Sequence, residues 1–126
     1  MDLMRVRRGI IGRIKDYFDG IEWLYNYYIS SNGKTAKGDN ASSYTLNPMI
    51  MKAGTYRLKG FNSYAVKNIN YRIHEYNSDD KWVKQVTYFP IDAQSPVDAT
   101  FVLDHDSYIR ISMGKLYFTG TLTKIS

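Results

Sequence analysis

The sequence contains no cysteine, two histidines and three prolines among its 126 residues. Without cysteine there are no disulfide bonds, no thiolate nucleophile and no cysteine metal site. No apolar run approaches the roughly 18 residues that span a bilayer, so we expect no membrane partner. The hydrophobic content of 44% is typical of a globular protein, and the length suits one domain with a single core.

Catalytic motifs are also missing. The chain has no Gly-x-Ser-x-Gly elbow, no phosphate-binding glycine loop and no dinucleotide fingerprint. His74-Glu75 and Asp104-His105-Asp106 lack a second histidine at metal-ligand spacing, and we expect the second motif to be a solvated turn. Paired carboxylates for glycoside cleavage are left open, because the fold decides their separation. The sequence therefore predicts no catalytic residue, no metal and no cofactor.

The net charge of +5 is concentrated at the start of the chain. Residues 1–15 hold five basic side chains and one acidic side chain, whereas residues 16–126 hold the remaining 12 basic and 11 acidic ones. A nucleic-acid-binding domain carries its positive charge on the folded body. Since this body is nearly neutral, we do not expect nucleic acid as a partner.

Residues 1–21 allow two readings. Apolar side chains recur at three- and four-residue steps, which is typical of an amphipathic helix, but Gly9 and Gly12 each cost such a helix about 1 kcal/mol. The alternative is an arm that becomes ordered on a partner. We expect an anchoring arm over residues 1–21 and a β domain over residues 22–126. The candidate docking residues are Arg5, Arg7, Arg8, Ile10, Ile11, Arg13 and Ile14.

From Glu22 onward the apolar pattern changes to a period of two, which predicts strands. Seven or eight short strands separated by turn residues favour an all-β fold, an antiparallel jelly-roll-like β-sandwich. The expected strands lie within residues 22–29, 49–52, 55–61, 69–76, 82–89, 100–103, 108–113 and 116–123.

Four local expectations follow from this pattern. Residues 30–43 form an exposed, mobile loop, and residues 82–89 form an edge strand because neither of their faces is uniformly apolar. Gly114-Lys115 makes a two-residue hairpin turn. Leu116, Phe118 and Leu122 then share one face of the last strand.

Aromatic residues are abundant, with 12 tyrosines, five phenylalanines and two tryptophans. Tyrosine and tryptophan combine a large apolar face with a polar tip, which suits protein interfaces and sugar rings. Most of these tyrosines also fit an ordinary role in cross-strand packing. The candidates for an exposed aromatic patch that contacts a glycan or a protein partner are Tyr76, Trp82, Tyr88 and Tyr108.

Outward-facing basic residues offer a further hypothesis. They form a basic strip for single-stranded nucleic acid if their strands are neighbours. Acidic residues on the same segments favour a solvated sheet face instead. The basic residues concerned are Arg57, Lys59, Arg72 and Arg110.

Three segments, MIMKAGTYRLKGF, INYRIHEYNSDDKWVKQ and ATFVLDHDSYIRISMG, carry a resemblance to a known module. The pattern Ala-Gly-Thr-Tyr (53–56), then Tyr-Asn (76–77), then Tyr-Ile-Arg-Ile (108–111) resembles a β-sandwich of bacteriophage tail, fibre and accessory proteins. The opening MDLMRVRRGIIG is similar to the start of short virion proteins. Related carbohydrate-binding-like sandwiches share the pattern.

This resemblance implies a non-enzymatic virion component, either a capsid decoration or head-fibre subunit or a tail component. Its partners would be other virion proteins and further copies of itself as a homo-oligomer, and it would be assembled in the host cytoplasm. The arm would anchor the protein and the sandwich would be displayed. The alternative that the residues leave open is a glycan-binding module that recognises host-surface carbohydrate.

Overall fold

The computed structural model describes residues 14–66 and 69–126. Within these ranges the chain forms antiparallel strands and one short 3₁₀ helix, and it contains no α-helix. The predicted all-β sandwich is confirmed, and its jelly-roll connectivity stays a prediction. The elements are β1 (Trp23–Tyr25), β2 (Tyr27–Ile29), β3 (Thr35–Lys37), β4 (Ser43–Thr45), β5 (Met49–Met51), β6 (Gly54–Asn62), β7 (Ile69–Tyr76), β8 (Trp82–Ile91), β9 (Ser95–Leu103), β10 (Ser107–Ser112), η1 (Lys115–Tyr117) and β11 (Phe118–Lys124).

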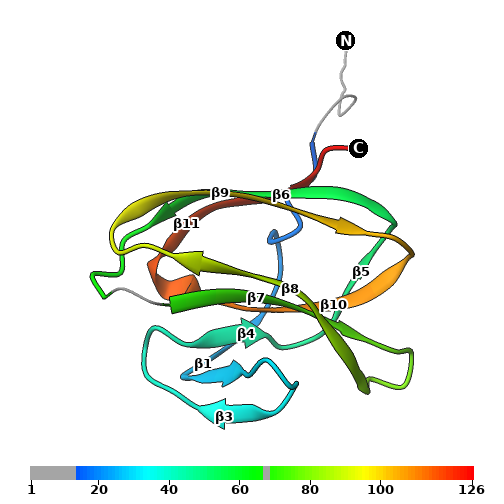
Figure 1. Ribbon diagram of the computed structural model, residues 1–126, viewed down its shortest axis with the longest axis horizontal. Helices are drawn as coiled ribbons and strands as arrows, with labels where there is room; N and C mark the ends of the chain where they lie inside the picture. The colour runs from blue at the N-terminus through cyan, green and yellow to red at the C-terminus, as the bar shows by residue number, and fades with distance from the viewer. Residues whose placement is uncertain (1–13, 67–68) are drawn as a thin grey trace.

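Two sheets form the sandwich. The six-stranded sheet has the order β1-β4-β10-β7-β8, with β5 also paired to β10, and the three-stranded sheet has the order β11-β6-β9. Figure 1 shows the three-stranded sheet above β7, β8 and β10 of the six-stranded sheet, with its strands β1 and β4 and the hairpin strand β3 lowest. The strand β8 lies at the edge of its sheet, as the mixed pattern of residues 82–89 predicted. Pro90 lies on this edge strand, where a missing N–H is tolerated.

The core lies between the two sheets and follows the period-two pattern of the strands. In β10, Ile109 and Ile111 are buried while Tyr108 is exposed. The facing strand β6 contributes Tyr56 and Leu58, and both are inaccessible to solvent. Because successive side chains of a strand point to opposite faces, this alternation fixes which face of each sheet is inward.

Residues 16–21 pack into the sandwich, so the folded domain begins six residues before the boundary expected at Glu22. The Asp16 carboxylate accepts hydrogen bonds from the backbone N–H groups of Phe18 and Leu122, both at 3.0 Å. Tyr17 donates its N–H to the Leu122 carbonyl at 2.8 Å. Phe18 is buried against the rings of Trp23 and Phe118. The segment therefore connects the edge of the three-stranded sheet to the core.

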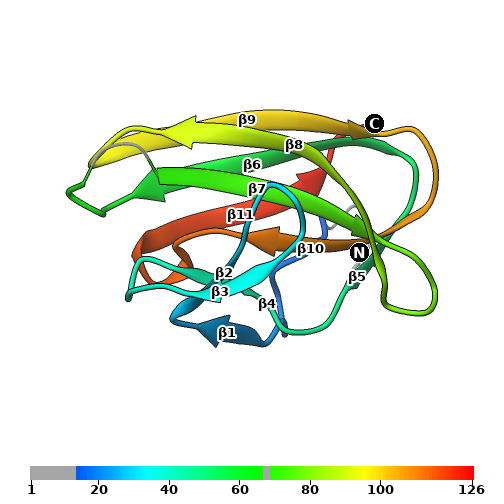
Figure 2. The ribbon, with the colours of Figure 1, turned by 60° about the horizontal axis from the view of Figure 1, so that its bottom comes forward.

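Residues 22–29 do not form the single strand that was expected. Asn26 adopts a left-handed conformation (φ 69°) and separates β1, in the six-stranded sheet, from β2, which pairs only with β3. This β2–β3 hairpin includes part of the segment expected to be an exposed, mobile loop. Figure 2 shows the hairpin lying over the six-stranded sheet. The loop expectation was wrong for residues 35–37, which form β3. Ile29, the last residue of β2, is completely buried.

The predicted hairpin at Gly114-Lys115 was also wrong. The strands on either side of it, β10 and β11, belong to different sheets, and η1 connects them across the end of the sandwich. Leu116 lies in η1 and is exposed, whereas Phe118 and Leu122 are buried as expected. A glycine turn signal does not distinguish a hairpin from a connection between sheets.

Candidate functional site

The outer face of the six-stranded sheet, turned away from the three-stranded sheet, holds six of the nine candidate residues that lie in the described ranges. Residues that are opposite one another on neighbouring strands share a face. The register of β10, β7 and β8 therefore places three rows of side chains on this outer face. These rows are Tyr108–Tyr76–Trp82, Arg110–His74–Gln85 and Ser112–Arg72–Tyr88.

The four aromatic candidates thus lie on one face, but they are not equally exposed. Tyr88 is 51% exposed, and Trp82 and Tyr108 are each 37% exposed. Tyr76 is buried, because the Arg110 guanidinium lies 4.6 Å from its ring centroid. The expectation of an exposed Tyr76 was wrong. Burial also raises the pKa of its phenol.

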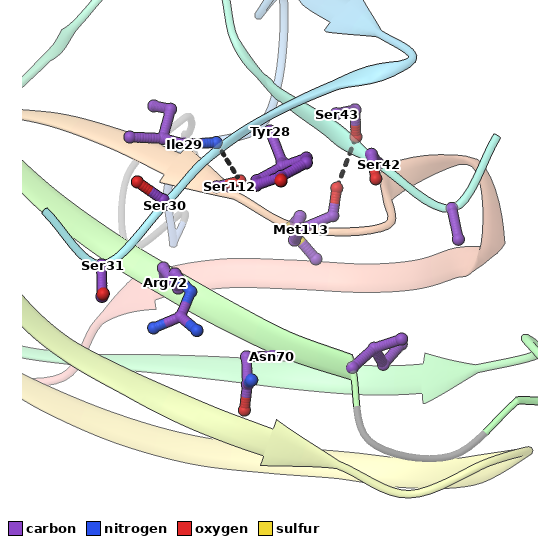
Figure 3. Close-up of a pocket in the computed structure, with 12 residues that line it drawn as sticks. Tyr28, Ile29, Ser30, Ser31, Ser42, Ser43, Asn70, Arg72, Ser112 and Met113 are labelled. Atoms are coloured by element: carbon purple, nitrogen blue, oxygen red, sulfur yellow. Dashed lines mark hydrogen bonds between the residues drawn. The ribbon is translucent and has the colours of Figure 1, made fainter. Parts of the chain in front are cut away.

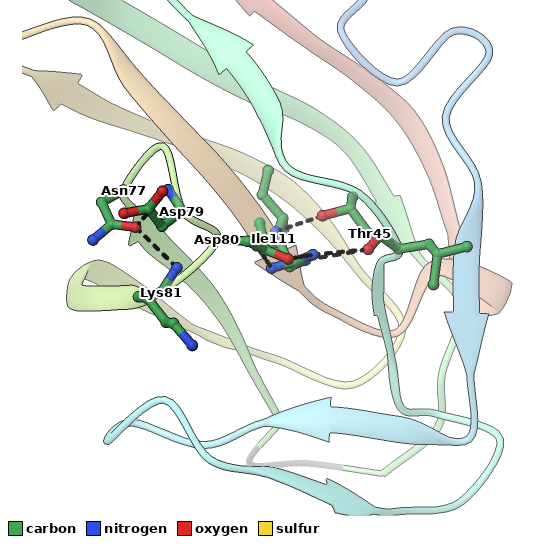
Figure 4. A network of polar contacts seen from close by, with 8 residues as sticks. Thr45, Asn77, Asp79, Asp80, Lys81 and Ile111 are labelled. Atoms are coloured by element: carbon green, nitrogen blue, oxygen red, sulfur yellow. Dashed lines mark hydrogen bonds and ion pairs between the residues drawn. The ribbon is translucent and has the colours of Figure 1, made fainter.

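Arg110 joins three segments of the outer face. Figure 4 shows Asp80, its partner in the β7–β8 turn, and the Thr45–Ile111 contact between β4 and β10. Its guanidinium donates to both carboxylate oxygens of Asp80, at 2.7 and 3.2 Å, and also to the Leu46 carbonyl at 3.1 and 3.3 Å. The hydrogen bonds from Arg110 to Asp80 lower the pKa of the Asp80 carboxyl. Arg110 is therefore a structural residue that holds the β7–β8 turn against the break between β4 and β5.

His74 and Trp82 hold the β2–β3 hairpin on this face. Trp82 Nε1–H donates to His74 Nδ1 at 3.0 Å, so the neutral histidine carries its proton on Nε2. Burial lowers the pKa of His74 to about 4. The indole ring lies directly under Gly33, where a Cβ atom would overlap it and where φ is +84°. The hairpin turn therefore needs glycine both for its backbone conformation and for this close contact.

A pocket of about 280 Å³ lies between the β2–β3 hairpin, the segment before β4 and the outer face. Figure 3 shows the Arg72 guanidinium between Ser31 and Asn70. The pocket is lined mainly by small and polar residues, together with the Tyr28 ring. Its lining residues are Tyr28, Ile29, Ser30, Ser31, Ala41, Ser42, Ser43, Ile69, Asn70, Arg72, Ser112 and Met113.

Several of these polar groups hold the walls of the pocket together. Ile29 donates its N–H to Ser112 Oγ at 3.0 Å, and the Ser43 hydroxyl donates to the Met113 carbonyl at 2.5 Å. Arg72 Nη1 donates to Gln85 Oε1 at 2.9 Å, and its guanidinium lies 5.4 Å from the Tyr88 ring centroid. The sequence had indicated Arg72 and Tyr88 for other reasons, but it gave no signal for the pocket, because its walls come from segments far apart in the chain.

His105 lies in an exposed bend, as expected, and its imidazole also contacts two carboxylates. Its Nε2 lies 2.7 Å from Glu75 Oε2, and its Nδ1 lies 2.5 Å from Asp104 Oδ1. Hydrogen bonds to Glu75 and then Asp104 raise the pKa of His105, and the protonated imidazole forms an ion pair with Glu75. In residues 14–66 and 69–126, no group of three or more histidine and carboxylate side chains is arranged to hold a metal ion.

The remaining candidates are the arm and the basic strip. Arg5, Arg7, Arg8, Ile10, Ile11 and Arg13 lie outside the described residues, and Ile14 is exposed. Arg57 and Lys59 lie on the three-stranded sheet, whereas Arg72 and Arg110 lie on the outer face of the other sheet. Arg57 is paired with Asp98 at 2.7 Å. The four basic residues therefore do not form one strip.

Comparisons with known proteins add no family. No family model matches the chain, and searches of curated proteins and of solved structures found no significant match. None of the helical segments in the described part of the chain is long and apolar enough to cross a membrane.

Proposed function

We propose that the protein is a non-enzymatic structural subunit of a bacteriophage particle. The residues before Asp16 attach it to other virion proteins, and the sandwich is displayed on the head or tail. We expect the displayed protein to be a homo-oligomer, because subunits of a particle are arranged symmetrically.

The observation that carries the proposal is the position at which the N-terminal arm joins the sandwich, at Asp16 and Tyr17. The chain enters the sandwich beside its own C-terminus: Tyr17 bonds to Leu122, and Thr55 donates its N–H to the Ser126 carbonyl at 3.3 Å. Asp16 and Ser126 are bound to strands of the three-stranded sheet, while the β2–β3 hairpin and the outer face lie on the opposite side of the sandwich (Figure 1). If the protein is attached where the arm joins the sandwich, the outer face of the six-stranded sheet points away from the particle.

The test counts this chain on purified particles by quantitative mass spectrometry against the major shell and tail proteins. We expect a fixed, symmetric copy number. A truncated chain that lacks residues 1–14 keeps Asp16 and Phe18, so it should fold but fail to join the particle. Incorporation of the truncated chain at the full copy number, or absence of the intact chain from every particle, would contradict the proposal. Native mass spectrometry of the isolated chain tests the homo-oligomer.

A second candidate, glycan binding, is favoured by the exposed rings of Tyr88, Tyr108 and Trp82 on the outer face. Flat aromatic surfaces next to polar groups suit sugar rings. A glycan array probed with the intact chain tests this candidate, and Tyr88→Ala is the first variant to compare. Saturable glycan binding that is weakened by Tyr88→Ala would support this candidate. An array on which the chain binds no glycan would argue against it.

A further inference from the structure

The pocket beneath the β2–β3 hairpin has one charged group in its lining, Arg72. The guanidinium is half-buried, and its polar side-chain contact among the described residues is the neutral Gln85. Arg57 and Arg110, in contrast, each pair with an aspartate. A half-buried guanidinium with no acidic partner is stabilised by an anion that brings its own carboxylate or phosphate oxygens.

The other polar groups of the pocket suit hydroxyls. Ser31, Ser42 and Asn70 line the pocket and are at least partly exposed to solvent. Serine hydroxyls and the asparagine amide each donate and accept, so they match sugar hydroxyls, which do the same. A lining with several such groups and one cation is typical of a site for a small, polyhydroxylated anion.

The rings beside the pocket add an apolar surface. Tyr28 lines the pocket and is 39% exposed, and the half-exposed Tyr88 ring packs against Arg72. Such rings contact the C–H face of a sugar. The volume of about 280 Å³ is at the small end of ligand pockets, which fits a terminal monosaccharide.

We propose that this pocket binds a carboxylate-bearing sugar, such as a terminal uronic acid, with the carboxylate on the Arg72 guanidinium and the hydroxyls on Asn70 and the serines. The inference rests on the glycan-binding proposal, and it adds the chemical class of the sugar and the place where it binds.

The test is a titration of the isotope-labelled intact chain, followed by NMR at about 0.15 M salt, where exposed charges are screened. The probes are glucuronate, glucose as the neutral ring, and acetate as the carboxylate without a ring. We expect saturable shifts at Ser31, Asn70 and Ser112 with glucuronate, and binding at least about tenfold weaker for the other two probes, because each loses one class of charge-assisted or hydroxyl contact.

The variants separate the guanidinium from general effects. We expect Arg72→Gln to weaken glucuronate binding about tenfold or more, and Arg72→Lys to fall between it and the unaltered chain, since lysine keeps the charge but not the planar fork. Arg57→Gln, on the other sheet, is the matched control and should change nothing. The spectra without ligand show whether each variant is folded.

Four results would overturn the inference. Acetate that binds as tightly as glucuronate would indicate a simple anion site. Glucose that binds as tightly would remove the role of the carboxylate. Undiminished binding by a folded Arg72→Gln chain would place the ligand elsewhere. If Tyr88→Ala abolishes binding to a neutral glycan while glucuronate causes no shifts, the glycan-binding proposal stands and this pocket assignment fails.

Discussion

Phe18 offers a direct test of where the folded domain begins. Its ring is buried at the edge of the core, with ring centroids 5.3 Å from Trp23 and 6.2 Å from Phe118. If residues 16–21 are part of the domain, Phe18→Ala removes a core side chain and leaves a cavity. If they belong to a separate arm, the substitution leaves the stability of the sandwich unchanged.

The structure sets the size of the effect. Truncation of a buried phenylalanine to alanine costs about 3–5 kcal/mol. Phe18 keeps 8% of its surface exposed and lies at the end of the core, so we expect about 3 kcal/mol. For a domain of this size, 1 kcal/mol corresponds to about 4 °C in Tm. The variant should therefore melt about 12 °C below the unaltered chain.

Urea unfolding followed by far-UV circular dichroism measures this difference without depending on Trp23. The matched control is Ile14→Ala, an exposed apolar residue four positions earlier, which should change the free energy of unfolding by less than about 0.5 kcal/mol. A cost below about 1 kcal/mol for Phe18→Ala would refute the packing of this segment.

Three further predictions concern the outer face and its neighbourhood. Burial lowers the pKa of His74 to about 4. The neutral His74 therefore stabilises the fold above the ordinary histidine pKa of about 6.5, and this contribution falls by about 3 kcal/mol in total as pH drops toward 4. Urea unfolding at pH 7 and pH 4.5 should show a smaller loss of stability for His74→Gln than for the unaltered chain. The raised pKa of His105 acts in the opposite direction. Its contribution to stability is present below about pH 6.5 and is lost as pH rises through the folded pKa. An NMR titration of the imidazole should show a lower His105 pKa in Glu75→Gln, and an unchanged pKa would argue against the ion pair. Arg110→Met removes the hydrogen bonds to Asp80 and the Leu46 carbonyl. It should lower the free energy of unfolding, measured in urea, by about 1–3 kcal/mol. A loss as small as that of Arg57→Gln would mean that the network contributes little.

The strands were predictable where one face of a segment is buried by the core. Ile109 and Ile111 alternate with Tyr108 and Arg110, and the structure has the same faces inward and outward. The same reasoning found the edge strand β8 from its mixed pattern. Burial against a single core leaves a periodic pattern in the sequence, so it can be recognised without the structure.

The outer face was less predictable because a second layer covers it. His74 and Tyr76 are polar or amphipathic residues on the side away from the core, which the pattern indicates as exposed, yet both are buried. The β2–β3 hairpin and Arg110 cover them. The pocket is formed by residues near positions 30, 42, 70 and 112, and no local motif links segments that only the fold brings together.

The hydrogen bond between Asp16 and Leu122 joins residues 106 positions apart, and this has a consequence for the order of events during synthesis. The β6 strand needs β11 as its second partner, and β11 is the last strand of the chain. A growing polypeptide whose β11 residues are still inside the ribosome therefore lacks both the second neighbour of β6 and the support for Phe18. Because most pairings are distant in sequence, we expect the sandwich to fold slowly and only after β11 has emerged. Until then, its exposed apolar strands must be kept from associating with other chains.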